Sequence, residues 1–346
     1  MLFKGIMMQS LQAQIKEYLK KLDALLVAHY YQCDEVVEMA DIIGDSLELA
    51  RKASQSPHST IVFCGVAFMG QSVKVLAPKK RVIMPKLACC SMARMIDDDY
   101  FDESMRTLKQ AGLQESDIFP ITYINSNASI KAKVGKMGGV CCTSSNALKI
   151  FEYALQTNKK IFFLPDRCLG INLADKKGLK SCVLSKATKD EILQSQVICY
   201  DGYCSVHQIF SVKDIEFYRN RYKNILIVSH PECDPSVIQQ SDFVGSTSQI
   251  IQFVESLDKN QSVAIATEAN LVNRLRKDSK NIFVLSRNEI PQCPTMNETS
   301  LPDVLRVLEA FSENGSNLFK SMNEVIIPSD VAKYAKIALD RMLELS

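Results

Sequence analysis

The chain has 346 residues, 47% of them hydrophobic and 23% charged, and its 41 basic and 39 acidic residues give a net charge of +2. This balance excludes a broad basic surface for nucleic acids, and the length exceeds one ordinary core, which predicts two or three domains. No apolar run reaches the length of a membrane span, and residues 1–22 form an amphipathic pattern unlike a signal peptide. We therefore expect a cytoplasmic protein without a membrane segment.

Twelve cysteines are the unusual feature of the composition. A reducing cytoplasm argues against a framework of disulfides. No two cysteines have C-x-x-C spacing, so zinc-finger spacing is excluded and any metal site must be assembled from distant segments. Two interpretations stay open: the cysteines pack as small hydrophobic residues, or a few of them bind a metal.

Short apolar runs alternate with helical patterns along the whole chain. The runs predicted as buried strands are Ala24–Ala28, Ser59–Cys64, Arg81–Met84, Ile118–Ile124, Lys160–Leu164, Asn224–Ser229, Ser262–Thr267 and Asn281–Leu285. Between them, apolar residues recur at helical spacing, as in Asp45–Ala53 and Thr247–Leu257. Strands that alternate with helices over short connections predict an α/β fold with parallel sheets.

An internal repeat indicates more than one domain of this kind. Residues 27–50 align with residues 228–251 when His29 and His230 are taken as origins. In both copies an Asp lies twelve residues on, a Gly fifteen and a hydroxyl residue seventeen. Residues 121–151 have the same outline of strand, polar loop, short strand and helix, so three related units of about one hundred residues would fill the chain.

Three of the four histidines, His29, His207 and His230, lie in polar segments beside predicted strands or loops. A neutral imidazole can donate and accept hydrogen bonds near pH 7, so we favour binding or proton transfer over a purely structural role. Glu232 follows His230 in the sequence HPEC. An acid/base role for Glu232 is the functional alternative to an ordinary surface carboxylate.

Three hydroxyl residues, Ser46, Ser144 and Thr247, each open a predicted helix after a strand. They are either simple N-caps or, if the three helix N-termini converge, parts of a pocket that binds anions. The chain has no G-x-G-x-x-G and no P-loop pattern, so no motif supports nucleotide binding.

Three cysteines, Cys90, Cys204 and Cys293, lie in polar, turn-rich stretches just after predicted strands or strand-like segments. Inert packing is favoured for those in more apolar or helical surroundings, which are Cys33, Cys64, Cys182 and Cys199. An iron–sulfur cluster needs thiolates but not clustered spacing, so a cluster on the first three is a hypothesis that the residues alone leave open.

Ten segments, taken in chain order, resemble the quinolinate synthase family, and together they extend over nearly the whole chain. The motifs that carry the resemblance are AHYYQ (28–32), GDSLELA (44–50), ACCSMA (88–93), TYINSNASIKA (122–132), CTSSNA (142–147), LPDRCLG (164–170), GYCSVH (202–207), SHPECDPSV (229–237), DFVGSTSQI (242–250) and CPTMN (293–297). The resemblance implies three similar three-layer α/β/α domains with parallel sheets around a pseudo-threefold axis, with the active site at their junction. We place these domains at residues 1–105, 106–195 and 196–300, followed by a helical segment, 301–346, that packs back on the body.

The resemblance also implies the activity. It implies an enzyme of the transferase class that condenses iminoaspartate with dihydroxyacetone phosphate to quinolinate, phosphate and two waters, in de novo NAD biosynthesis. It implies a [4Fe–4S] cluster on three cysteines, by matching motifs Cys90, Cys204 and Cys293, whose open fourth iron acts as a Lewis acid. An aspartate oxidase or dehydrogenase is the expected supplier of iminoaspartate, and no nucleic-acid or membrane partner is expected.

Roles for individual residues follow from the same resemblance. Catalytic roles are implied for Glu232, Tyr31, His230 and Tyr123. Substrate contacts are implied for His29, Ser46, Tyr123, Asn125, Ser144, His230, Glu232 and Thr247. His207 and Met296 adjoin the cluster ligands and are expected to line the same cavity.

The sequence departs from the family pattern at the first ligand. Ala88-Cys89-Cys90-Ser91 stands where the family usually has A-G-C-S, which leaves Cys89 as an alternative ligand to Cys90. Two other functions stay open on the residues alone. One is an iron–sulfur hydro-lyase, which needs no phosphate site, and the other is a redox or iron sensor, which needs four cysteine ligands and no substrate pocket.

Overall fold

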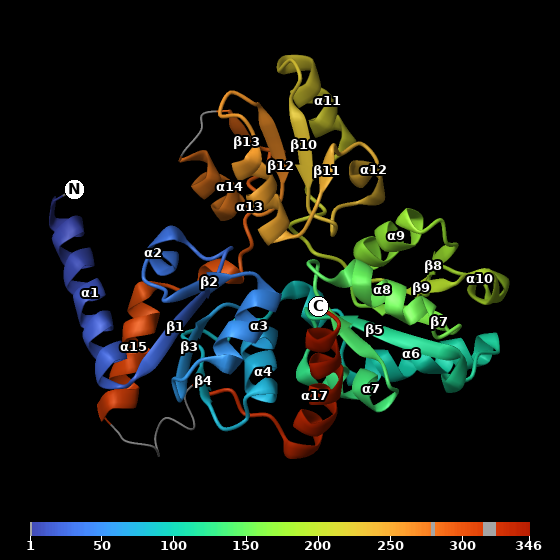
Figure 1. Ribbon diagram of the computed structural model, residues 1–346, viewed down its shortest axis with the longest axis horizontal. Helices are drawn as coiled ribbons and strands as arrows, with labels where there is room; N and C mark the ends of the chain where they lie inside the picture. Colours follow the sequence, from blue (N-terminus) through green and yellow to red (C-terminus); the bar gives the residue numbers. More distant parts are fainter. Residues whose placement is uncertain (1, 278–280, 314–322) are drawn as a thin grey trace. The chain divides into compact units, whose positions relative to one another are not determined.

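The structure is a computed structural model that describes residues 2–277, 281–313 and 323–346 (Figure 1). The chain divides into two compact units. The first unit consists of residues 1–90 and 294–329, and the second of residues 91–293 and 330–346.

The first unit is built on four parallel strands in the order β2-β1-β3-β4. Its elements are α1 (Leu2–Lys21), β1 (Ala24–His29), α2 (Asp34–Val37), β2 (Ile42–Gly44), α3 (Ser46–Gln55), β3 (Thr60–Cys64), α4 (Ala67–Leu76), β4 (Arg81–Ile83), a 3₁₀ turn η2 (Met296–Glu298) and α15 (Leu301–Glu313).

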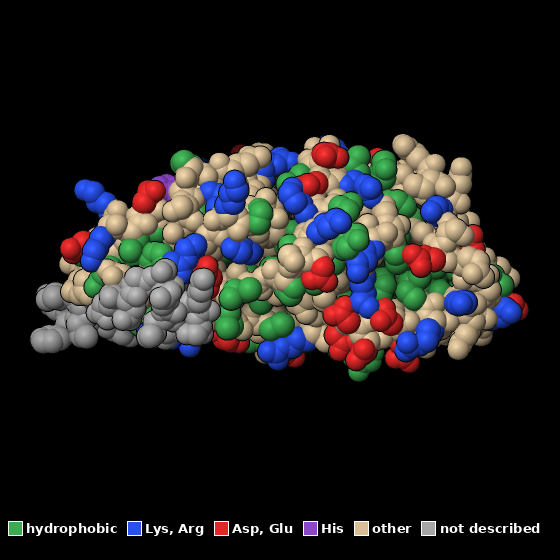
Figure 2. Space-filling model, turned by 90° about the horizontal axis from the view of Figure 1, so that it is seen from below, with side chains coloured by type: hydrophobic (Ala, Val, Ile, Leu, Met, Phe, Trp, Pro, Cys, Tyr) green, Lys and Arg blue, Asp and Glu red, His purple; other side chains and the backbone are tan. Residues whose placement is uncertain are grey.

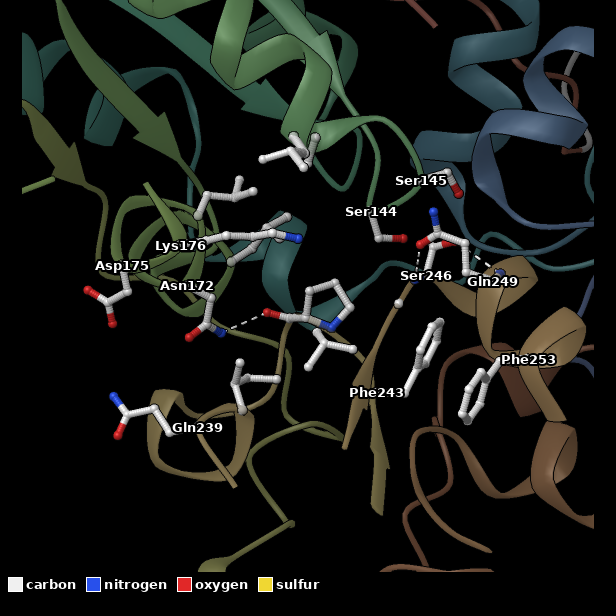
Figure 3. A pocket seen from close by; sticks show the side chains of 18 of the residues that line it. Ser144, Ser145, Asn172, Asp175, Lys176, Gln239, Phe243, Ser246, Gln249 and Phe253 are labelled. Atoms are coloured by element: carbon white, nitrogen blue, oxygen red, sulfur yellow. Dashed lines mark hydrogen bonds between the residues drawn. The ribbon is translucent and has the colours of Figure 1, made fainter. Parts of the chain in front are cut away.

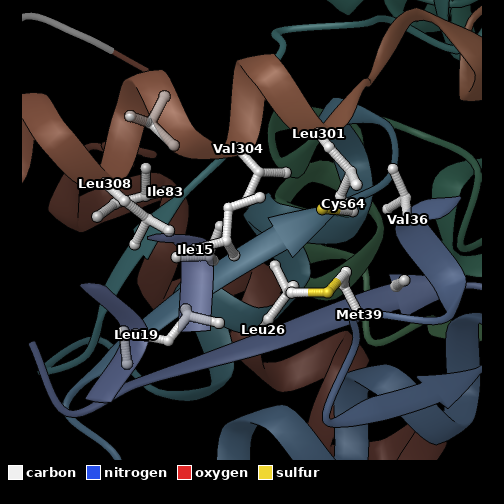
Figure 4. Close-up of a cluster of buried hydrophobic side chains, with 14 residues drawn as sticks. Ile15, Leu19, Leu26, Val36, Met39, Cys64, Ile83, Leu301, Val304 and Leu308 are labelled. Carbon is white, nitrogen blue, oxygen red and sulfur yellow. The ribbon is translucent and has the colours of Figure 1, made fainter. Parts of the chain in front are cut away.

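Helices cover both faces of this sheet. Alternate strand residues such as Leu26, Val62 and Ile83 form one face, which packs against α1, α2 and α15 (Figure 4). Helices α3 and α4 contact the same strands and each other, and they contribute no residue to that cluster, so they cover the opposite face. Every residue of β1 and β3 is therefore buried, which explains why these strands read as unbroken apolar runs.

The second unit contains two sheets. The first has five parallel strands in the order β6-β5-β7-β9-β8. Its elements are α5 (Ser91–Arg94), α6 (Asp98–Ala111), η1 (Glu115–Asp117), β5 (Ile118–Tyr123), α7 (Ala128–Lys136), β6 (Val140–Cys142), α8 (Ala147–Leu155), β7 (Lys160–Leu164), α9 (Arg167–Lys176), β8 (Ser181–Val183), α10 (Lys189–Gln194), β9 (Val197–Cys199) and α17 (Ser329–Glu344). Helix α17 packs beside α7, where the Arg341 guanidinium donates to the Gly139 carbonyl at 2.7 Å.

The other sheet of the second unit has four parallel strands in the order β11-β10-β12-β13. Its elements are α11 (Val212–Arg221), β10 (Leu226–Ser229), α12 (Pro235–Ile238), β11 (Phe243–Val244), α13 (Thr247–Ser256), β12 (Val263–Ala266), α14 (Ala269–Arg276) and β13 (Ile282–Val284). Helices α11 and α12 pack on one face, with Ile227 and Ala264. Helices α13 and α14 pack on the other face, with Val228 and Ile265.

The predicted α/β fold is confirmed by these three parallel sheets. Every predicted strand is present, and its ends differ from the prediction by at most two residues. The prediction missed β8 and β9, which have three residues each.

Within the described ranges, no helix is both long enough and apolar enough to span a membrane. Lys/Arg and Asp/Glu side chains are interspersed over the face of the molecule that Figure 2 presents. That face therefore carries no broad basic field, in agreement with the small net charge.

Candidate functional site

The first strand of each sheet ends at an equivalent position. His29 pairs with Gly44 on β2, and Tyr123 pairs with Cys142 on β6. His230 directly follows Ser229, which pairs with Val244 on β11, so it lies opposite Gly245. The backbone N–H of the residue after His29 bonds to Gly44, and the one after Tyr123 bonds to Cys142. His29, Tyr123 and His230 therefore occupy the same place in three copies of one arrangement.

Two further sets of predicted residues follow from this equivalence. Two residues after the strand-end positions lie Tyr31, Asn125 and Glu232. Two residues after their partners on the neighbouring strand lie Ser46, Ser144 and Thr247. Nine residues predicted to bind or transform substrate thus fall at three equivalent positions, all at the carboxyl ends of parallel strands, where open α/β sheets bind ligands.

The hydroxyl residues relate to the helices differently from the prediction. Ser46 and Thr247 do begin α3 and α13, but the capping side chains are those of Asp45 and Ser246, which accept hydrogen bonds from N–H groups of the first turn. The prediction that Ser144 opens a helix is wrong. Ser144 lies in a turn, held by a 2.7 Å bond from the Thr143 N–H to the Asn146 side chain, and α8 begins only at Ala147.

Two of the histidines have the same local geometry. The Nδ1 atom of His29 accepts the backbone N–H of Tyr31 at 3.1 Å. The Nδ1 atom of His230 accepts that of Glu232 at 3.4 Å. Because Nδ1 of each ring faces the backbone, a substrate contact of either imidazole would come from Nε2.

Glu232 is the centre of a buried polar cluster in the second unit. The Tyr123 hydroxyl donates to its Oε1 at 2.5 Å, and His207 Nδ1 lies 3.1 Å from its Oε2. The other nitrogen of His207, Nε2, lies 3.3 Å from the hydroxyl of Thr267. The rings of His207 and His230 stack at 4.5 Å, so this cluster joins residues from both sheets of the unit.

The surroundings shift the pKa values of Glu232 and Tyr123 in opposite directions. Burial raises the pKa of Glu232, but His207, His230 and the hydrogen bonds from His207 and Tyr123 together outweigh it and lower the pKa to about 2. Burial, followed by the charge of Glu232, raises the pKa of Tyr123 well above its ordinary value. Glu232 is therefore a proton acceptor near neutral pH, and Tyr123 keeps its proton.

A second buried carboxyl, Asp166, was not predicted. It is the N-cap of α9, and its Oδ1 accepts the Leu169 N–H at 3.0 Å. Its Oδ2 is buried and has no hydrogen-bond partner among the described residues. Burial, and then the charge of Glu232, raises the pKa of Asp166 well above its ordinary value. Two carboxyls with pKa values pushed apart are a recurrent feature of acid/base sites.

The three predicted cluster ligands also occupy equivalent positions. In each sheet the third strand in chain order, β3, β7 or β12, is followed by a helix. The first residue of that helix donates its backbone N–H to the carbonyl of the residue two positions before the cysteine. The three donor and acceptor pairs are Ala67 to Ala88 at 2.8 Å, Arg167 to Gly202 at 2.9 Å, and Ala269 to Pro291 at 2.9 Å. Counting from these carbonyls favours Cys90 as the counterpart of Cys204 and Cys293, whereas Cys89 corresponds to Tyr203 and Gln292.

The cysteines differ in their surroundings. Cys90, Cys204 and Cys293 are half-buried. Cys204, His207 and Glu232 offer ligand atoms that all lie within 4.8 Å of one another, an arrangement that could hold a metal ion. The thiols of Cys33, Cys64, Cys182 and Cys199 have pKa values raised chiefly by burial, which fits the expectation that they pack as small hydrophobic residues.

A cavity of about 790 Å³ in the second unit borders the loop that carries Glu232 (Figure 3). Its lining includes Ser144, Pro231 and Gly245, and it extends outward to Lys176 and Phe253. The amide of Asn172, also in the lining, donates to the carbonyls of Pro231 and Cys233, both at 2.9 Å. It thereby holds the loop that carries Glu232.

The structure thus brings Tyr123, His230, Glu232 and Cys204 together and sets Ser144 at the edge of a cavity. His29, Tyr31, Ser46 and Cys90 belong to the other unit, so their grouping with Glu232 stays a prediction. Met296, at η2 of that unit, accepts a hydrogen bond from the Gln32 amide at 3.7 Å. Sequence reasoning gave no role to Asp166 and Thr267. Asp166 follows a predicted strand and its Pro, and Thr267 is the last residue of the predicted strand Ser262–Thr267, places where a polar residue is a signal.

Comparison with known proteins identifies the family. The sequence model of the quinolinate synthetase A protein family matches residues 13–344. A quinolinate synthase of Helicobacter pylori (strain HPAG1) is 58% identical over 338 residues, which cover 97% of this chain and 98% of the relative. Quinolinate synthases of Geobacillus sp. (strain WCH70) and Listeria monocytogenes are 38% and 39% identical, over 99% and 97% of this chain and 96% and 92% of the relatives. The chain belongs to the quinolinate synthetase A family.

Proposed function

We propose that this protein is a quinolinate synthase, an enzyme of de novo NAD biosynthesis. It would condense iminoaspartate with dihydroxyacetone phosphate, releasing phosphate and two waters. The observation that carries the proposal is the buried carboxyl group of Glu232, hydrogen-bonded to Tyr123 and within 4.8 Å of both the Cys204 and His207 ligand atoms. A reaction that forms an aromatic ring by successive loss of water needs such a group, because protons must be removed and returned at several steps.

We propose that Cys90, Cys204 and Cys293 bind a [4Fe–4S] cluster. Thiolates are the ligands that iron–sulfur clusters take, and the equivalent, half-buried positions of these three residues fit such a group. When bound by three cysteines, the cluster would supply an open iron that acts as a Lewis acid on substrate oxygens.

Proton transfer would rest on Glu232 and its partners. Glu232 would be the acid/base group, because its lowered pKa leaves an acceptor oxygen beside the Tyr123 hydroxyl and His207 Nδ1. The Tyr123 hydroxyl and His207 Nδ1 both reach the carboxylate and offer routes for returning the proton. Tyr31, two residues beyond His29, would be a further proton donor.

Substrate anions would be held by donors at the strand ends. His29 and His230 would donate from Nε2 to carboxylate oxygens, and Asn125 would donate through its amide. Ser46, Ser144 and Thr247 would bind phosphate or carboxylate with their hydroxyls and with neighbouring backbone N–H groups. Local donors of this kind suit a chain whose net charge is only +2.

The proposal extends to organisation and partners. The repeated strand order supports three domains, at residues 1–105, 106–195 and 196–300, around a pseudo-threefold axis with the active site at their junction, and a C-terminal segment, 301–346. An aspartate oxidase or dehydrogenase would supply iminoaspartate in the cytoplasm.

Anaerobic purification tests the proposal directly. We expect a coloured protein whose visible absorbance is that of an iron–sulfur centre with thiolate ligands. Supplied with an iminoaspartate-generating system and dihydroxyacetone phosphate, it should form quinolinate and phosphate in equal amounts. Phosphate release without quinolinate, or a colourless protein after cluster reconstitution, would contradict the proposal.

A further inference from the structure

Lys131, on α7, is a charged residue that lies completely inside the second unit. Its side chain has no exposed surface. Burial of an ammonium group is costly unless the surrounding groups compensate for the lost water, and burial lowers the pKa of Lys131 to about 8. A lysine in this position therefore requires a local explanation.

The contacts of Lys131 supply one. Its Nζ donates to the carbonyl of Ile124 at 2.8 Å and also to the carbonyl of Ser126. These two carbonyls flank Asn125 on either side. Because helical side chains lean toward the N-terminus of their helix, Lys131 reaches back past the start of α7 to the loop that precedes it.

That position is unfavourable for a cation in general, since the N-terminus of a helix carries partial positive charge. The two carbonyls offset this repulsion only if they stay turned toward the ammonium group. The ammonium group and the loop conformation are thus mutually dependent.

Other bonds fix the same loop at its base. The Ser126 hydroxyl donates to the Tyr123 carbonyl at 3.0 Å and lies 2.9 Å from the Thr122 hydroxyl. The Ser126 N–H bonds to the Ile124 carbonyl at 2.8 Å. Asn125 is the half-buried residue at the tip of this turn, so the direction of its amide depends on the two carbonyls that Lys131 holds.

We propose that Lys131 is a positioning residue that holds the Ile124–Ser126 turn so that Asn125 faces the substrate. The role of Asn125 as a substrate contact rests on the proposed function, whereas the holding of the turn does not. Lys131 itself touches no reacting group.

A double-mutant cycle tests the positioning role in the cluster-loaded enzyme. Lys131→Met keeps an unbranched side chain that is one atom shorter, and it removes the charge and the donor. We expect it to raise KM for dihydroxyacetone phosphate or iminoaspartate about tenfold or more with a smaller change in kcat, and we expect the same of Asn125→Ala. In the Asn125→Ala background, Lys131→Met should change kcat/KM by about twofold or less, because both changes remove the same contact.

Lys136→Met is the matched control, since Lys136 is exposed on the same helix and should alter neither constant. Effects of Lys131→Met and Asn125→Ala that multiply fully would overturn the positioning role. Lys131→Arg, which keeps the charge, should restore part of the lost affinity. If Lys131→Met does not fold, Lys131→Gln serves in its place because it retains a donor.

Hydrogen exchange separates this inference from the proposed function. The amides of residues 124–127 should exchange at least tenfold faster in Lys131→Met than in the unmodified protein. The exchange rates of peptides from the sheet β11-β10-β12-β13 should stay unchanged. Unchanged protection of the turn would overturn the inference even in an active enzyme. A protein that makes no quinolinate but shows faster exchange would refute the proposed function alone and leave the holding of the turn established.

Discussion

Replacing Asp166 by Asn should make the protein more stable, and increasingly so as the pH rises. Asn keeps the size of Asp166 and can still accept the Leu169 N–H as the N-cap of α9. It cannot ionise. Because burial and the nearby Glu232 charge raise the pKa of Asp166 in the folded protein, the substitution removes a group that the fold keeps protonated.

The sign and size follow from proton linkage. In the unfolded chain Asp166 ionises near its ordinary pKa of about 3.9. Above that pH the folded state binds more protons than the unfolded state, so the free energy of unfolding falls by up to about 1.4 kcal/mol per pH unit until the folded-state pKa is reached. Between pH 5 and pH 7 the Asn variant should therefore gain stability relative to the unmodified protein, by at most about 3 kcal/mol.

Urea denaturation of the cluster-free, reduced proteins at pH 5, 6 and 7 measures this difference, since every other titrating group is common to both. Asp97→Asn is the matched control, because Asp97 is the exposed N-cap of α6 and accepts the Tyr100 N–H at 2.9 Å. The control variant should show no gain that grows with pH. A stability difference for Asp166→Asn that stays flat, or that moves in favour of the unmodified protein as pH rises, would refute the neutral state of Asp166.

Three further changes test the site and its packing. Glu232→Gln keeps the size of the side chain but removes its charge. Quinolinate formation should therefore fall about 10²–10⁴-fold, while the cluster absorbance is retained. Undiminished activity would contradict the acid/base role. Cys90→Ala should prevent cluster reconstitution, measured by absorbance, and Cys89→Ala should not; the opposite pattern would reassign the ligand. Gly135→Ala would place a methyl group 2.1 Å from the Tyr334 carbonyl oxygen, so α7 and α17 must separate. We expect a loss of about 1–3 kcal/mol in urea denaturation, and an unchanged midpoint would show that the helices yield without cost.

The strands could be predicted because both faces of each sheet are covered, which makes their sequences continuous apolar runs. The repeat could also be predicted, and its physical basis is visible in one pair of residues. Asp41 and Asp242 each accept the backbone N–H of the adjoining first strand, from Leu26 at 2.8 Å and Ile227 at 2.7 Å. The aspartate twelve residues after each strand-end histidine therefore has the same structural role in these two copies, where it binds the first strand.

The polar partners of the site could not be predicted in the same way. Thr267 and His207 are sixty residues apart, and Tyr123 and Glu232 are more than one hundred apart, so no local spacing records their contact. The protonation of Asp166 depends on burial, which only the fold determines. The start of α8 was misplaced because the Asn146 side chain closes a turn around Ser144 before the helix begins.

Three of the four sets of equivalent positions divide into two kinds, and this division bears on the reaction. The cysteine position and the hydroxyl position carry the same chemistry in all three copies, in the sets Cys90, Cys204 and Cys293, and Ser46, Ser144 and Thr247. The position two residues beyond the first strand differs in every copy, as Tyr31, Asn125 and Glu232. A cluster bound by three ligands and anionic groups held by hydroxyls can use a threefold set of similar donors. Acid/base chemistry on two different substrates cannot use three similar groups, because each step needs one group with the right pKa at one place. Glu232 is our candidate for that place, because among Tyr31, Asn125 and Glu232 it is the carboxyl group, and His207, His230 and Tyr123 around it lower its pKa.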